Sequence, residues 1–205
     1  MSSTALVGVP FPVSQTLLEA LERAYAGPPR AYHHFGHVHE VLGHFREVPA
    51  WIDAQAVAAA ILFHDAVYEP GRADNEARSA ELAKMLLAVH VPGIDLERVA
   101  SLILLTARHG SLRPSDVDAE AALFLDCDMA ILGSSPERFA RYEEEIAAEY
   151  GHVPKEAYAV GRAMFFQKVL ATETIYLSPF FRERLEAAAR ANIERALNAG
   201  ASFGP

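Results

Sequence analysis

The fold is decided by one stretch of the sequence, Ala56-Val-Ala-Ala-Ala-Ile-Leu-Phe-His-Asp-Ala-Val-Tyr68. A helix made of these residues is apolar on every side, which is typical of a helix buried inside a protein. It nevertheless carries His64 and Asp65 near its C-terminal end. Burying such groups is costly unless they are paired or bind a metal. The stretch therefore predicts a buried helix that ends in a polar site.

The rest of the chain follows a helical pattern as well. Apolar residues recur every three or four positions, alanine is abundant, and no run alternates as a β-strand would. We expect an all-α fold, a helical bundle of about eight or nine helices. Asp53 and Asp74 are expected to cap two of these helices. The predicted helices, separated by proline and glycine turns, cover about residues 14–27, 31–45, 54–68, 74–90, 95–109, 117–132, 155–176 and 179–198, and a further helix starts at about residue 135.

The length and composition indicate a globular protein. With 205 residues, 51% of them apolar and 22% charged, we expect a single domain over residues 1–205, with flexible ends at 1–12 and 199–205. A net charge of −9 argues against binding to a nucleic acid polymer. The single cysteine excludes a disulfide framework and a cysteine-rich zinc site. No apolar run approaches the roughly 20 residues of a membrane span, so we expect a cytoplasmic protein without a membrane partner.

Several polar residues stand in apolar surroundings, and their types suit a metal. Helical scaffolds hold divalent cations with imidazoles and carboxylates from facing helices. Candidates on the chain are His37, His64-Asp65, Asp126 and Asp128. Asp126 and Asp128, two residues apart on a helix, point to nearly opposite sides, so only one of them can face a given pocket. His33 lies four residues before His37, which predicts a shared helix face.

A set of motifs in a fixed order carries a resemblance to a known family. The motifs are Arg30-Ala-Tyr-His-His-Phe-Gly-His37, Phe63-His-Asp-Ala-Val-Tyr68, Asn75-Glu-Ala-Arg-Ser-Ala80, Thr106-Ala-Arg-His109 and Phe124-Leu-Asp-Cys-Asp128. With them the chain resembles the HD superfamily of predicted metal-dependent phosphohydrolases, in a little-characterised bacterial branch, over roughly residues 28 to 176. The resemblance implies the metal ligands His37, His64, Asp65 and Asp128, because Asp128 fits the last ligand better by position than Asp126.

The resemblance also implies an activity. The chain would hydrolyse a phosphate ester, a nucleotide or another small phosphorylated metabolite, with a metal-bound hydroxide as the nucleophile. The metal would be manganese, iron, cobalt, nickel or zinc, and magnesium is less suited to this ligand set. Asp65 and Glu76 would handle the proton, and His109 would assist at the phosphoryl group. The expected substrate contacts are His33, Arg30, Arg108 and Arg78.

Plainer interpretations stay open for some of these residues. Glu76 also suits the first turn of a helix, where an acid complements the helix dipole, and the arginines also suit an exposed surface. Two other functions are consistent with the motifs. One is a di-iron HD-type oxygenase that uses His33 and His109 as additional ligands; the other is a catalytically silent protein that binds a metal or a nucleotide. The amphipathic C-terminal helices would suit a homodimer.

Overall fold

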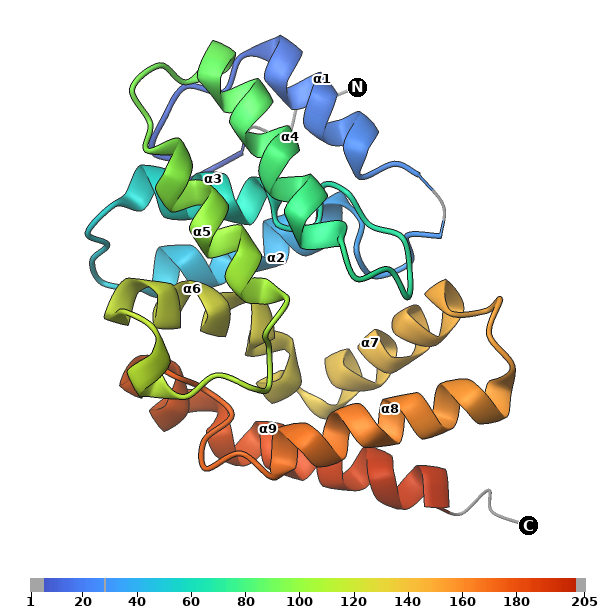
Figure 1. Ribbon diagram of the computed structural model, residues 1–205. Coiled ribbons are helices and arrows are strands. Elements are labelled where there is room, and N and C mark those ends of the chain that lie inside the picture. The colour runs from blue at the N-terminus through green and yellow to red at the C-terminus, as the bar shows by residue number, and fades with distance from the viewer. Residues whose placement is uncertain (1–5, 28, 202–205) are drawn as a thin grey trace. The chain divides into compact units, whose positions relative to one another are not determined.

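The protein is all-helical, as predicted. A computed structural model describes residues 6–27 and 29–201, and within these ranges the chain forms nine α-helices and two short 3-10 helices, with no strand (Figure 1). None of the described helices combines the length and the apolar character needed to cross a membrane. The α-helices are α1 (Gln15–Ala24), α2 (Phe35–Glu47), α3 (Ala54–Phe63), α4 (Asn75–His90), α5 (Leu96–Thr106), α6 (Ala119–Met129), α7 (Pro136–Glu149), α8 (Lys155–Leu170) and α9 (Pro179–Ala201), and the 3-10 helices are η1 (Pro114–Asp116) and η2 (Ala130–Gly133).

The chain divides into two compact units, residues 1–107 and residues 108–205. The single domain over the whole chain stays a prediction. The flexible ends expected at 1–12 and 199–205 fall partly on residues 1–5 and 202–205, which lie outside the described residues. Inside the described part, Phe11 is buried and α9 continues to Ala201, three residues beyond its expected end.

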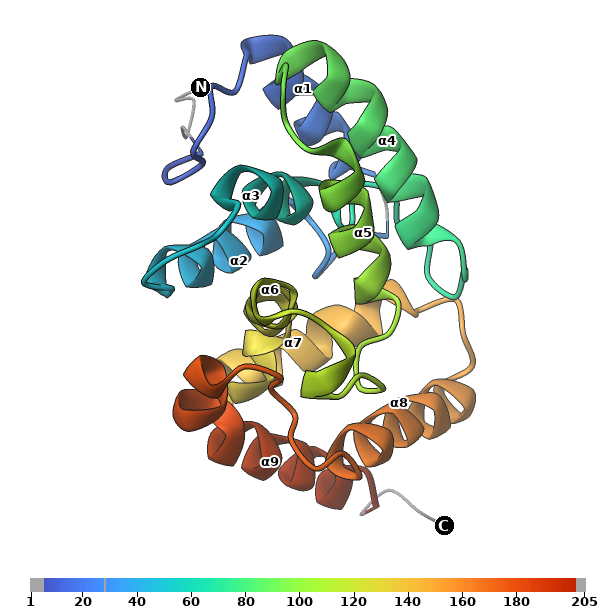
Figure 2. The ribbon, with the colours of Figure 1, turned by 60° about the vertical axis from the view of Figure 1, so that its left-hand side comes forward.

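Helix α3 forms the core of the first unit. All residues from Ala56 to Phe63 are buried, which confirms the prediction of a buried apolar helix. Helices α2, α4 and α5 pack against it, and α4 and α5 lie side by side in both views of the ribbon (Figures 1 and 2). Burial of a large apolar side chain such as Ile61, Leu62 or Phe63 contributes about 1.5–3 kcal/mol. Asp53 caps the helix as predicted, since its carboxylate accepts the N–H of Ala56 at 2.9 Å.

Helix α2 begins later than the sequence pattern predicted. Its N-cap is His34, whose Nδ1 accepts the N–H of Gly36 at 2.8 Å. The imidazole lies so close to Gly36 that an added β-carbon would meet its Cε1 at 2.3 Å. Because His34 is the N-cap, His33 lies before the helix. The prediction that His33 and His37 share a helix face is therefore wrong.

The second unit contains helices α6 to α9 and both 3-10 helices. Helix α9 packs against α6, α8 and η2. Helix α8 ends at Leu170, although the pattern predicted helix to residue 176. The reason lies in the segment that follows, where consecutive backbone N–H groups donate to carboxylates instead of helix carbonyls. Ile175 and Tyr176 donate to Glu186 at 3.0 and 3.2 Å, and Leu177 and Ser178 donate to Asp126 at 2.8 and 2.7 Å.

Asp126 joins α6 to the start of α9 from a buried position. Its side chain is among the most enclosed charged groups of the second unit, with 1% of the residue exposed. It also accepts the hydroxyl of Ser178 at 2.6 Å. Burial raises the pKa of Asp126 to about 7, although the hydrogen bonds from Ser178 and Leu177 act in the opposite direction. A buried acid with several hydrogen bonds of this kind serves the fold.

Replacing Asp126 with alanine is expected to lower the free energy of unfolding by about 3 kcal/mol, because two backbone N–H groups would lose their acceptor in a buried place. Urea denaturation followed by circular dichroism measures this loss. Asp116→Ala is the matched control: Asp116 accepts the backbone N–H of Arg113 at 2.9 Å, but the side chain of Arg113 is 80% exposed, so the loss there should be much smaller. Equal losses in the two variants would contradict the structural role of Asp126.

Candidate metal centre

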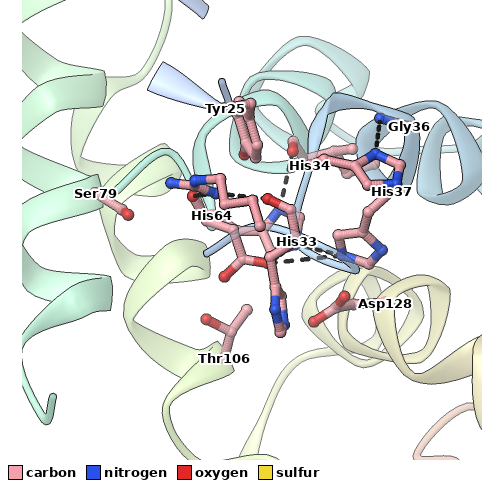
Figure 3. Close-up of polar contacts among 12 residues, drawn as sticks. Tyr25, His33, His34, Gly36, His37, His64, Ser79, Thr106 and Asp128 are labelled. Atoms are coloured by element: carbon pink, nitrogen blue, oxygen red, sulfur yellow. Dashed lines mark hydrogen bonds and ion pairs between the residues drawn. The ribbon is translucent and has the colours of Figure 1, made fainter. Parts of the chain in front are cut away.

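Three predicted metal ligands meet in the first unit. His37 is on α2, His64 is the C-cap of α3, and Asp65 follows directly. The Nε2 atoms of His37 and His64 are 3.1 Å apart, and Oδ2 of Asp65 lies 3.6 Å from the first and 3.0 Å from the second. Both histidines are buried, whereas the side chain of Asp65 is 18% exposed. Figure 3 shows the imidazoles of His37 and His64 turned toward each other.

The main chain of α3 fixes the proton of His64. Nδ1 of His64 lies 2.9 Å from the carbonyl oxygen of Ile61. A carbonyl oxygen only accepts, so Nδ1 carries the hydrogen and donates it. Nε2 of His64 is then the ring nitrogen that faces His37 and Asp65, at 3.1 and 3.0 Å. Histidines that bind metals use the same arrangement, in which a hydrogen bond from the second ring nitrogen sets the tautomer.

The spacing of the three ligand atoms fits a first-row metal. Bonds of about 2.0–2.2 Å at angles between a right angle and the tetrahedral angle separate neighbouring ligand atoms by roughly 2.8–3.6 Å. The three observed separations run from 3.0 to 3.6 Å. Two imidazoles and one carboxylate suit manganese, iron, cobalt, nickel or zinc. The contact between the two imidazoles also forms if the Nε2–H of His37 donates a hydrogen bond to Nε2 of His64, so the geometry fits a metal without requiring one.

The end of α3 is held by side chains. The last carbonyls of a helix have no partner inside it and need donors from elsewhere. The carbonyl of Leu62 accepts the hydroxyl of Tyr25 at 3.2 Å, and Tyr25 itself is 2% exposed. The carbonyl of Phe63 accepts the N–H of Ala66 at 3.0 Å. The chain can therefore leave the helix at Phe63 inside the protein, and this places His64 and Asp65 at the bend.

The loop after Asp65 is fastened to α4 by two buried side chains. The hydroxyl of Ser79 accepts the N–H of Val67 at 3.0 Å and donates to its carbonyl at 3.2 Å. The amide of Asn75 does the same for Glu69, at 3.1 and 2.9 Å. Asn75 and Ser79 belong to the motif Asn75-Glu-Ala-Arg-Ser-Ala80, but no role was predicted for them. Their spacing of four, one face of a helix directly after a turn, was the available signal.

The other predicted residues of the first unit lie around these ligands in different ways. The ring of His33 stacks on Tyr68, with centroids 4.1 Å apart, and meets the ring of His37 at 5.9 Å. Glu76 is in the first turn of α4 and is not a member of the three-residue ligand group found among the described residues. Arg78 is 43% exposed and pairs with Glu69 at 2.7 Å, and this hydrogen bond lowers the pKa of Glu69.

Three further predicted residues belong to the second unit. Nδ1 of His109 lies 3.5 Å from Oδ2 of Asp128. Arg108 is exposed. Both carboxylate oxygens of Asp126 accept backbone N–H groups, so Asp128 is the acid of this pair that contacts another predicted site residue. This favours the assignment made by position, and Asp128 as the fourth metal ligand stays a prediction.

Comparison of the chain with family models, with curated proteins and with solved structures found no match. The resemblance to the HD superfamily therefore depends on the motifs quoted above. What the structure adds is the convergence of His37, His64 and Asp65, which come from two of these motifs.

Replacing Ser79 with alanine should lower the free energy of unfolding by about 2 kcal/mol, because the N–H and the carbonyl of Val67 both lose their partner. Urea denaturation measures the change. Ser101→Ala is the matched control, since Ser101 is an exposed helical serine whose hydroxyl donates only to the carbonyl of Arg98. A Ser79→Ala variant as stable as Ser101→Ala would show that Ser79 does not hold the loop.

Proposed function

We propose that this chain is a metal-dependent phosphohydrolase that acts on a phosphate ester, a nucleotide or another small phosphorylated metabolite. The observation that carries the proposal is the convergence of His37 Nε2, His64 Nε2 and Asp65 Oδ2, with the other ring nitrogen of His64 held by the Ile61 carbonyl. The type of reaction comes from the resemblance to the HD superfamily. The donor set favours manganese, iron, cobalt, nickel or zinc.

A bound divalent metal would supply a Lewis acid and would lower the pKa of a bound water from about 16 toward neutrality. The residues of the chain provide the surroundings for that chemistry. The Ile61 carbonyl holds the ring of His64 in one tautomer, and the buried rings of His37 and His64 keep bulk water from their side of the centre. The partly exposed carboxylate of Asp65 is the group able to accept a proton from an incoming water.

The remaining roles are proposals that only the resemblance supports. Glu76 as a proton acceptor, and His109 and His33 as groups that meet the phosphate, follow from the resemblance alone. Arg78 and Arg108 stand as substrate contacts on the same ground, and Arg78 already has an acidic partner in Glu69. The two alternative functions, a di-iron oxygenase and a silent binding protein, become outcomes of the experiment below.

Elemental analysis of the protein, purified without added metal and again after manganese or cobalt is supplied, tests the centre. We expect a transition metal in the wild type and its loss in His64→Ala and Asp65→Ala variants that keep their helical circular dichroism. His90→Ala is the matched control, because Nδ1 of His90 contacts Ser14 at 3.0 Å, outside the ligand group. The metal-loaded wild type should then hydrolyse members of a panel of nucleotides and small phosphate esters.

Each outcome separates the functions. Metal with turnover of a phosphate ester supports the proposal, and two irons per chain with oxygen consumption would replace it by the oxygenase. Metal without turnover of any panel member would favour the silent binding protein. A wild type that takes up no manganese or cobalt would overturn the proposed mechanism.

A further inference from the structure

We infer that Arg30 is a positioning residue of the metal centre, which joins the two chain segments that carry the metal ligands. The motifs predict Arg30 as a substrate contact. The inference rests on the proposed function, because it concerns the geometry of the same site.

The guanidinium of Arg30 donates to main-chain carbonyls on both segments. Nη1 donates to the carbonyl of His33 at 2.6 Å and to that of Asp65 at 2.9 Å, and Nη2 donates to that of Ala66 at 3.1 Å. His33 precedes α2, which carries His37, and Asp65 is itself a ligand. One side chain therefore ties the start of the His37 helix to the loop that carries Asp65.

Two tyrosines fix the plane of this guanidinium. Its central carbon lies 5.0 Å from the ring centre of Tyr25 and 5.6 Å from that of Tyr68. Tyr25 also binds the carbonyl of Leu62, and Tyr68 stacks on His33. Arginine favours such faces because its charge is delocalised over a flat group. Tyr25 thus contacts the end of α3 just before Asp65, and Tyr68 lies in the loop after Asp65 and contacts His33.

The need for Arg30 follows from the end of α3. Because the helix stops at Phe63, the carbonyls of Asp65 and Ala66 have no helical partner and require donors. Their orientation sets the direction of the Asp65 side chain, whose Oδ2 is 3.0 Å from His64. Lysine carries an equal charge, but its ammonium is a compact point without a planar fork. From its place between the two tyrosine rings, an ammonium therefore cannot replace all three hydrogen bonds of the guanidinium.

A titration with Co²⁺, followed by its visible absorption, tests the inference on the full chain. We expect Arg30→Lys to bind Co²⁺ at least about tenfold more weakly than the wild type, the size of effect seen when groups that orient metal ligands are removed. The absorption bands should also change, since the ligand geometry would be altered. A role in the fold alone would lower the melting temperature without either effect.

Arg190→Lys is the matched control. Arg190 also donates to three main-chain carbonyls, those of Leu170, Thr172 and Glu173 at 3.2, 3.1 and 3.1 Å, in a segment without a proposed ligand. This variant should lose thermal stability yet bind Co²⁺ as tightly as the wild type. The comparison separates positioning of the metal centre from general stabilisation of a loop.

Two results would overturn the inference, and they differ. If Arg30→Lys binds Co²⁺ like the wild type but binds inorganic phosphate more weakly, Arg30 is a substrate contact, and the proposed function stands. If the wild type itself binds no Co²⁺, both the proposed function and the inference on Arg30 are wrong.

Discussion

The structure of the first unit depends on how α3 ends. A helix whose side chains are buried from Ala56 to Phe63 cannot end in water, so its last carbonyls must find donors inside the protein. Those donors include one side chain from a distant part of the chain and one from the residue that follows the helix. The hydroxyl of Tyr25 binds Leu62, and the ring of His64 binds Ile61. Every residue that satisfies this helix end is also close to the candidate metal centre.

The same constraint connects stability to chemistry. The hydrogen bond that satisfies the Ile61 carbonyl also sets the tautomer of His64, and the donor that satisfies the Asp65 carbonyl also orients that residue. Asn75 and Ser79 then hold the next part of the loop, each through one N–H and one carbonyl. A substitution at any of these groups would first change the backbone conformation and, through it, the positions of the ligand atoms.

Much of this could be read from the sequence, and the failures have definite causes. The apolar run of α3 predicted its burial, and the polar pair His64-Asp65 inside that run predicted a site. The start of α2 and the end of α8 were predicted wrongly, because capping by His34 and hydrogen bonds to Asp126 and Glu186 replace helical ones. Helix α3 ends at Phe63, before its predicted end at residue 68, where Tyr25 and Ala66 donate to its last carbonyls. Such bonds join residues far apart in sequence, or use a histidine where an aspartate or serine is usual. The hydrogen bonds of Arg30, Asn75 and Ser79 were not predicted, because their partners are main-chain atoms, which no residue pattern displays.

The alanines of α3 have a consequence for how this protein can vary. Ala58, Ala59 and Ala60 are fully enclosed, with helices α2, α4 and α5 packed around the helix that carries them. An enclosed alanine leaves no room for growth, and each added methylene in a tight core typically costs about 1–3 kcal/mol. In a library of random variants, this helix should accept little more than glycine or serine at these positions. The segment whose sequence predicts the fold is thus also one that tolerates few substitutions.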